Sequence, residues 1–349
     1  MPRCFLHQFH FPLLLLAFCA YFGTRAPAVF ASDFEAAGAS YDDDRASGYI
    51  SSQSASFQTD RLFSGKGRKS SFKLGLTERQ TTLKDDKTIF VREQLDGNPT
   101  TADQAATVSY DQGIVIGTRV GVVAGLQQSK ISNSQFVGVR AGQWWLRETL
   151  ETTVEVRHTS ADQRPITGTD FDGSKISLPE NLEGYNLALG LTSFVTTSTI
   201  VILNTSYTTR SDRPPASAVA AEVRQFITAT KSAVHVGVSH YENVGPIEPV
   251  TFTGTVVAYS AFGEWHQRFL ERFIGTGGYR YYVEEEHPRA ENVETKQLGS
   301  DQFYGMIRWR AGSEPWTQEG PEVYVFASRY TTNEPLAGFL LGLGGKFVW

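Results

Sequence analysis

Histidine and serine are the residues of this chain whose chemistry could support metal binding or catalysis. After residue 31 the histidines are His158, His235, His240, His266 and His287. No pair has the i, i+4 spacing that places two imidazoles on one helix face of a metalloprotease. His235 and His240 are five residues apart, so in a strand they point to opposite faces. We therefore expect no metal site and no cofactor.

A serine and histidine hydrolase is the catalytic alternative. Ser239 precedes His240, but neighbours in a strand point to opposite faces, and His158 with Ser160 is a commonplace pair at a strand end. No Gly-x-Ser-x-Gly elbow is present, and the glycines of 275–278 lie inside a strand pattern, where glycine more often marks a kink than a phosphate cradle. We expect no catalytic residue.

The elements that must carry these residues alternate apolar and polar side chains, which predicts strands with two different faces. The composition agrees, because 12% of the residues are aromatic and there are 32 Gly but only 2 Met. Clusters of Gly, Asp, Asn, Pro and Ser separate sixteen predicted segments, the first four of which are the least regular, so that fourteen is the alternative count. They lie near 48–58, 70–79, 87–94, 104–111, 114–126, 134–142, 149–158, 182–193, 199–210, 217–228, 232–242, 249–261, 268–284, 298–311, 321–330 and 336–349.

An even number of strands with about 20 residues per strand and connection is typical of a membrane-embedded, up-and-down antiparallel β-barrel. The polar connections at 159–181 and 284–295 then fall on one side, and the short links 194–198 and 228–231 on the other, whereas 311–320 is long for its side. Aromatic residues gather at segment ends, as at Trp144 and Trp145, which suits membrane interfaces. The core of an ordinary β-sandwich is the alternative interpretation of these aromatic residues.

Charged residues on the polar face of the strands would point into the barrel, because arginine at the lipid midplane costs about 2–4 kcal/mol. Arg272 and Arg280 beside Arg308 and Arg310 could form a basic ladder that attracts anions. The alternative is that these side chains pair with acids and merely fill the lumen. The predicted lumen-lining residues are Glu151, Glu155, Arg157, Glu222, Arg224, Arg272, Arg280, Arg308 and Arg310.

The N-terminus has the pattern of a secretory signal peptide. Arg3 precedes an apolar run over 11–22, and small residues at 28–31 predict cleavage after Ala31. The run is shorter than the ~20 residues of a spanning helix, which disfavours an uncleaved anchor, and the bulky Phe18 before Cys19 argues against a lipoprotein. The predicted domains are therefore a signal peptide at 1–31, a flexible acidic tail at 32–46 and a barrel at 47–349.

The predicted mature chain contains neither Cys4 nor Cys19, so it lacks the thiols of a disulfide framework or a cysteine metal site. Removing residues 1–31 takes two arginines and no acid, which leaves 30 basic against 37 acidic residues and a net charge of −7. This balance gives no reason to expect nucleic acid as a partner. Asp42, Asp43 and Asp44 could bind calcium, but a solvated charge run is the simpler interpretation.

The last residues, 344–349, resemble the C-terminal assembly signal of Gram-negative outer-membrane barrels: a glycine, two residues, the aromatic Phe347, one residue and the terminal aromatic Trp349. Gly342 departs from the polar residue that many such signals have there. The resemblance implies the bacterial outer membrane, with periplasmic chaperones, the barrel-assembly machinery and the lipid bilayer as partners. Residues 210–285 are also similar to a family of uncharacterised outer-membrane barrels, which adds nothing about chemistry.

Together these features predict an all-β barrel of 14–16 strands that lets small polar or anionic solutes diffuse through it. A non-conducting barrel for adhesion or envelope structure is the second hypothesis, and a barrel-embedded hydrolase is the third.

Overall fold

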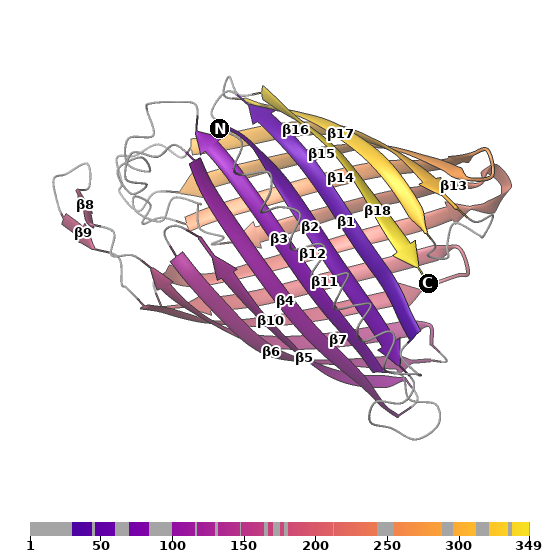
Figure 1. Ribbon diagram of the computed structural model, residues 1–349, viewed down its shortest axis with the longest axis horizontal. Coiled ribbons are helices and arrows are strands. Elements are labelled where there is room, and N and C mark those ends of the chain that lie inside the picture. Colours follow the sequence, from indigo (N-terminus) through magenta and orange to yellow (C-terminus); the bar gives the residue numbers. More distant parts are fainter. Residues whose placement is uncertain are drawn as a thin grey trace.

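In the computed structural model the chain forms one closed antiparallel barrel of 16 strands (Figure 1). The structure describes residues 30–43, 46–59, 70–83, 100–115, 117–129, 132–146, 148–163, 167–169, 175–177, 181–211, 213–242, 255–287, 296–311, 321–333 and 337–348. Among these residues no helix is long and apolar enough to cross a membrane. Each barrel strand pairs with its neighbours along the chain, and β1 closes the barrel against β18.

The barrel strands are long, as strands tilted across a barrel wall must be. They are β1 Phe30–Asp43, β2 Ala46–Thr59, β3 Ser70–Leu83, β4 Thr100–Val115, β5 Thr118–Gln128, β6 Ser132–Trp145, β7 Leu150–Gln163, β10 Asn181–Phe194, β11 Thr199–Arg210, β12 Arg213–Ile227, β13 Ser232–Glu242, β14 Thr255–Phe269, β15 Phe273–His287, β16 Lys296–Arg310, β17 Glu322–Thr332 and β18 Ala337–Val348. A short hairpin, β8 Thr167–Thr169 and β9 Lys175–Ser177, lies beyond one end of the barrel in Figure 1, and a single 3₁₀ turn, η1 Thr228–Thr230, links β12 to β13.

The predicted strand number is confirmed, and one strand of the barrel, β1, is not among the predicted segments. The predicted flexible tail at 32–46 is wrong over 32–43, which belongs to β1, so the barrel begins at Phe30 rather than at residue 47. Small residues, such as Ala36, Gly38 and Ala39, hide the apolar contrast of this strand, but it supplies the partner that the free edge of β18 requires. The segment predicted at 87–94 lies outside the described residues, as do the predicted signal residues 1–29.

The two ends of the barrel differ in their connections. We call the end at which β1 begins and β18 finishes the terminus end, and the opposite end the loop end. The strands that flank the predicted connections 159–181 and 284–295 meet at the loop end, whereas those that flank 194–198, 228–231 and 311–320 meet at the terminus end. The strand order therefore confirms which predicted connections share an end.

Large apolar side chains cover the outside of the wall. Val137 and Val139 alternate along β6 with Gly138 and Arg140, and both valines remain more than half exposed to the surroundings of the barrel. The same alternation places Leu341 and Leu343 outward on β18. Because water disfavours so much exposed apolar surface, this belt is the face that lipid would cover.

Aromatic residues mark the two ends of this belt. Trp145, Trp265 and Trp309 are exposed on strand segments near the terminus end, and Tyr185 and Tyr259 near the loop end. His158 lies against the ring of Tyr185 with ring centroids 4.8 Å apart, and His240 lies against Tyr259 at 4.9 Å. Amphipathic rings in these positions suit the two interfaces of a bilayer.

Candidate functional site: the inward face of the barrel

The candidate site is the inward face, since its side chains alternate with the apolar belt. On β7, Val154 and Val156 face outward, so Glu151, Glu155 and Arg157 occupy inward positions. The same rule places Glu222, Arg224, Arg280, Arg308 and Arg310 inward. Arg272 differs, because it lies in the exposed turn between β14 and β15, where its carbonyl oxygen accepts a 2.8 Å hydrogen bond from the Arg310 N–H.

Many of the inward arginines lie beside a carboxylate. Arg157 pairs with Glu155, and the Arg224 Nε lies 2.5 Å from Glu222 Oε1; in each pair the partners are two residues apart on one strand. Spacing of i, i+2 on one strand face therefore brings these predicted lumen residues together. Such pairing neutralises charge locally.

Other arginines pair with acids across one intervening strand, which the sequence does not single out. The register places Asp111 on β4 near Arg140 on β6, and the guanidinium bonds both carboxylate oxygens, with Nε to Oδ1 at 2.6 Å. Glu151 accepts from Arg119 at 2.5 Å.

The predicted basic ladder is partly compensated by an acid on the next strand. Glu322 on β17 lies 3.8 Å from Arg308 Nε and 3.3 Å from Arg310 Nη2. Arg280 is different, since its guanidinium lies over the ring of Phe262 at 5.7 Å, and among the described residues no carboxylate is within ion-pair distance. Among the predicted lumen-lining arginines, Arg280 is thus the one best placed to meet a solute anion.

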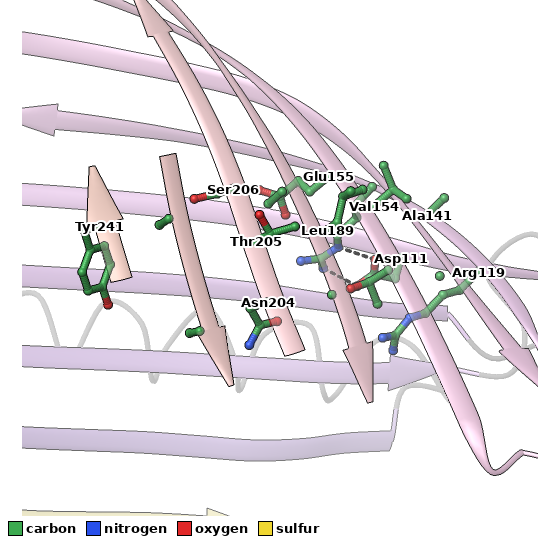
Figure 2. A pocket seen from close by; sticks show the side chains of 17 residues that line it. Asp111, Arg119, Ala141, Val154, Glu155, Leu189, Asn204, Thr205, Ser206 and Tyr241 are labelled. Atoms are coloured by element: carbon green, nitrogen blue, oxygen red, sulfur yellow. Dashed lines mark hydrogen bonds and ion pairs between the residues drawn. The ribbon is translucent and has the colours of Figure 1, made fainter. Parts of the chain in front are cut away.

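A cavity of about 570 Å³ opens on the wall from β4 to β13. It forms because inward positions of β10 and β12 carry small residues, including Ala188, Gly190 and Ala220. Figure 2 shows Asp111 and Arg119 on one side of the cavity and Tyr241 on the other. Polar groups of both charges around an open hollow suit small hydrated solutes.

A second polar group lies on the inward face near the terminus end, where the strand register brings His235, Glu264 and His266 together. From the sequence we expect no metal site, because only histidines within one strand or helix are compared there. This group is missed because its members lie on two strands. The sequence feature that could have indicated this group is the i, i+2 spacing of Glu264 and His266, which puts both side chains on one strand face.

The serine and histidine pairs do not assemble into hydrolase geometry. Ser239 faces inward and its hydroxyl lies 2.6 Å from that of Ser260, whereas His240 faces outward against Tyr259. His158 also faces outward, beside Tyr185. Of the predicted assembly signal, Phe347 pairs with Phe34 of β1, and Trp349 lies outside the described residues.

The fold has counterparts among solved structures. No protein-family model and no curated protein matches the chain. A bacterial polysaccharide outer membrane secretin is similar with a TM-score of 0.52 and 8% identity, over 91% of this chain and 98% of that one. CdiB from Acinetobacter baumannii is similar with a TM-score of 0.52 and 10% identity, over 91% of this chain and 60% of that one.

At these identities the likeness concerns the fold alone. The predicted likeness to outer-membrane barrels is confirmed at that level. The narrower likeness of residues 210–285 to an uncharacterised family has no matching family model and stays a prediction. The chain thus has the closed 16-strand architecture found in bacterial outer-membrane barrels.

Proposed function

We propose that this protein is a water-filled channel in the bacterial outer membrane through which small polar solutes, anions among them, diffuse passively. The observation that carries the proposal is the closed barrel with an apolar outer belt and a charged inner face. Sixteen strands enclose a lumen wide enough for water when no segment plugs it. Export through the signal peptide at 1–31 and insertion by the assembly machinery are part of the same proposal, as is a passive rather than an enzymatic role.

The distribution of inward charge supports weak rather than strong ion selectivity. Arg157, Arg224 and Arg140 each have a carboxylate beside them, so their fields largely cancel at the distance of a passing ion. Arg280 lies over Phe262 and, among the described residues, has no carboxylate within ion-pair distance. We therefore assign the anion preference of the channel chiefly to Arg280.

Planar-bilayer recording of the refolded protein tests this function. Wild type is expected to insert in discrete conductance steps with a modest anion preference. Arg280→Glu should lower the anion-to-cation permeability ratio severalfold, since one charge at 4 Å in water contributes about 1 kcal/mol. The combined Arg308→Glu and Arg310→Glu variant should change the ratio less for each charge replaced, because Glu322 already offsets these arginines.

Arg329→Glu is the matched control, because Arg329 occupies an exposed outward position on β17 and undergoes the same change of charge. Its permeability ratio should equal that of wild type. Absence of any conductance in a correctly folded barrel would rule out the channel and favour the non-conducting structural or adhesion barrel.

A further inference from the structure

Two histidines and a glutamate converge on the inward wall where β13, β14 and β15 lie side by side. His235 on β13 pairs in register with Glu264 on β14, and His266 follows Glu264 by two residues on the same strand face. The His266 Nε2 atom lies 3.1 Å from Glu264 Oε2 and 3.2 Å from His235 Nδ1, and the remaining side, from His235 Nδ1 to Glu264 Oε2, is 3.6 Å.

The three atoms His266 Nε2, Glu264 Oε2 and His235 Nδ1 form a triangle. It has the size of one face of a metal coordination sphere. Ligand atoms about 2.0–2.2 Å from one tetrahedral ion lie about 3.3–3.6 Å from one another. An ion placed above the inward side of the triangle could therefore reach all three atoms with little movement of the side chains. Two imidazole nitrogens and one carboxylate oxygen are a ligand set that zinc and copper favour.

Neighbouring side chains orient the ligands. His266 Nδ1 lies 2.9 Å from the Thr276 hydroxyl, and donation to that oxygen would leave the Nε2 lone pair directed at the triangle. The Tyr304 hydroxyl donates to Glu264 Oε1, which leaves Oε2 facing the two imidazoles. The ring of Phe226 contacts His235 edge-on, with centroids 6.4 Å apart.

Tyr304 reaches Glu264 by lying across the intervening strand β15 at a glycine. Gly278 pairs with both residues, and a Cβ at this position would lie 2.6 Å from Tyr304 Cε2. Any larger residue would displace the ring. The hydrogen bond that fixes Glu264 therefore depends on Gly278, as expected of a supporting contact in a built site.

In the tautomer that directs the His266 Nε2 lone pair into the triangle, the three facing atoms have too few protons to satisfy one another. With His266 Nδ1–H donating to Thr276 and both imidazoles neutral, at most one proton, on His235 Nδ1, lies inside the triangle. That proton can satisfy one contact, and Glu264 Oε2 then faces the His266 Nε2 lone pair at 3.1 Å. A cation accepts electron pairs from all three atoms at once.

We infer that His235, Glu264 and His266 bind a divalent transition-metal ion of the zinc or copper type, with the remaining coordination positions open to the lumen. The side chains of the three residues are 18%, 21% and 12% exposed, which leaves an approach from the inward side. The inference concerns binding to the wall and does not depend on whether the barrel conducts.

Calorimetric titration of ZnCl₂ and CuCl₂ into the full barrel, refolded in detergent and free of any histidine tag, tests the site. One equivalent is expected to bind wild type, with MgCl₂ giving no comparable heat. His235→Ala and His266→Ala should each weaken binding at least tenfold. His240→Ala is the matched control, because His240 is a strand histidine on the outward face, and its affinity should equal that of wild type.

Tyr304→Phe examines the positioning role of its hydroxyl. It should weaken binding about 10–100-fold and change the visible spectrum of the Co²⁺-loaded protein, since a supporting hydrogen bond orients its ligand. Heat-modifiable migration in electrophoresis shows that each variant still folds. Lack of stoichiometric binding by folded wild type, or an equal loss in His240→Ala, would overturn the inference. A barrel that binds metal but carries no current would refute only the proposed channel.

Discussion

Leu340 and Leu341 are adjacent residues of β18 on opposite faces of the wall, and they offer a direct test of its orientation toward lipid. Leu341 faces outward with 55% of its surface exposed, and its partner on β17 is Ala327, at the middle of that strand. Leu340 faces inward, opposite the buried Ser328. One substitution, leucine to arginine, can thus be made at nearly the same height on each face.

Leu341→Arg should lower the free energy of unfolding by about 2–4 kcal/mol, because the charge must enter lipid near the midplane. Leu340→Arg should cost less than about 1.5 kcal/mol, since its guanidinium can remain hydrated in the lumen while its stem contacts the wall.

Reversible urea unfolding in lipid vesicles, followed by tryptophan fluorescence, measures both free energies. Equal costs for the two variants, or a larger cost for Leu340→Arg, would refute the assignment of the faces. The same measurement in detergent should reduce the difference, because a micelle adapts to a charge more readily than a bilayer does.

Three further predictions concern the wall and its closure. Gly278→Val should destabilise the barrel by about 1–3 kcal/mol in the same urea assay, because it displaces the Tyr304 ring, while Gly263→Ala, with no atom within 4 Å of its added Cβ, should cost less. Deletion of residues 32–43 should abolish heat-modifiable migration and leave the chain sensitive to protease, since β18 would lose its partner. Trp145 emission, isolated by comparison with Trp145→Phe, should be quenched more by lipids brominated near the headgroup than by lipids brominated near the chain end; the opposite order would contradict an interfacial ring.

The alternation of side chains predicts most of this fold because the wall has one apolar and one polar face. The prediction succeeds where the contrast is strong, as in β7 and β18, and fails in β1, whose small residues carry little contrast. It also ends the segment at 249–261 too early, since β14 continues to Phe269, because the apolar pattern does not state where strand pairing ends.

The site was harder to predict, since it depends on register between strands. Alternation places Arg157 and Glu155 on one face, and their i, i+2 spacing makes their contact foreseeable. The pairs that join Asp111 to Arg140 and Glu322 to Arg310 require the offset of strands that only the folded barrel fixes. The grouping of His235 with His266 has the same origin, because a one-residue slip would turn one imidazole outward.

The seam between β1 and β18 has a consequence for how the polypeptide folds. Ser40 donates a hydrogen bond to the Leu341 carbonyl oxygen across 301 positions of sequence, whereas most other strand pairs are joined by hairpins. Hairpins can form soon after both of their strands are available, but the seam requires the first and the last strand together. Until then both edges can pair with other chains. Closure is therefore the slow, whole-chain step, and the interval before it is the period in which protection from aggregation matters most.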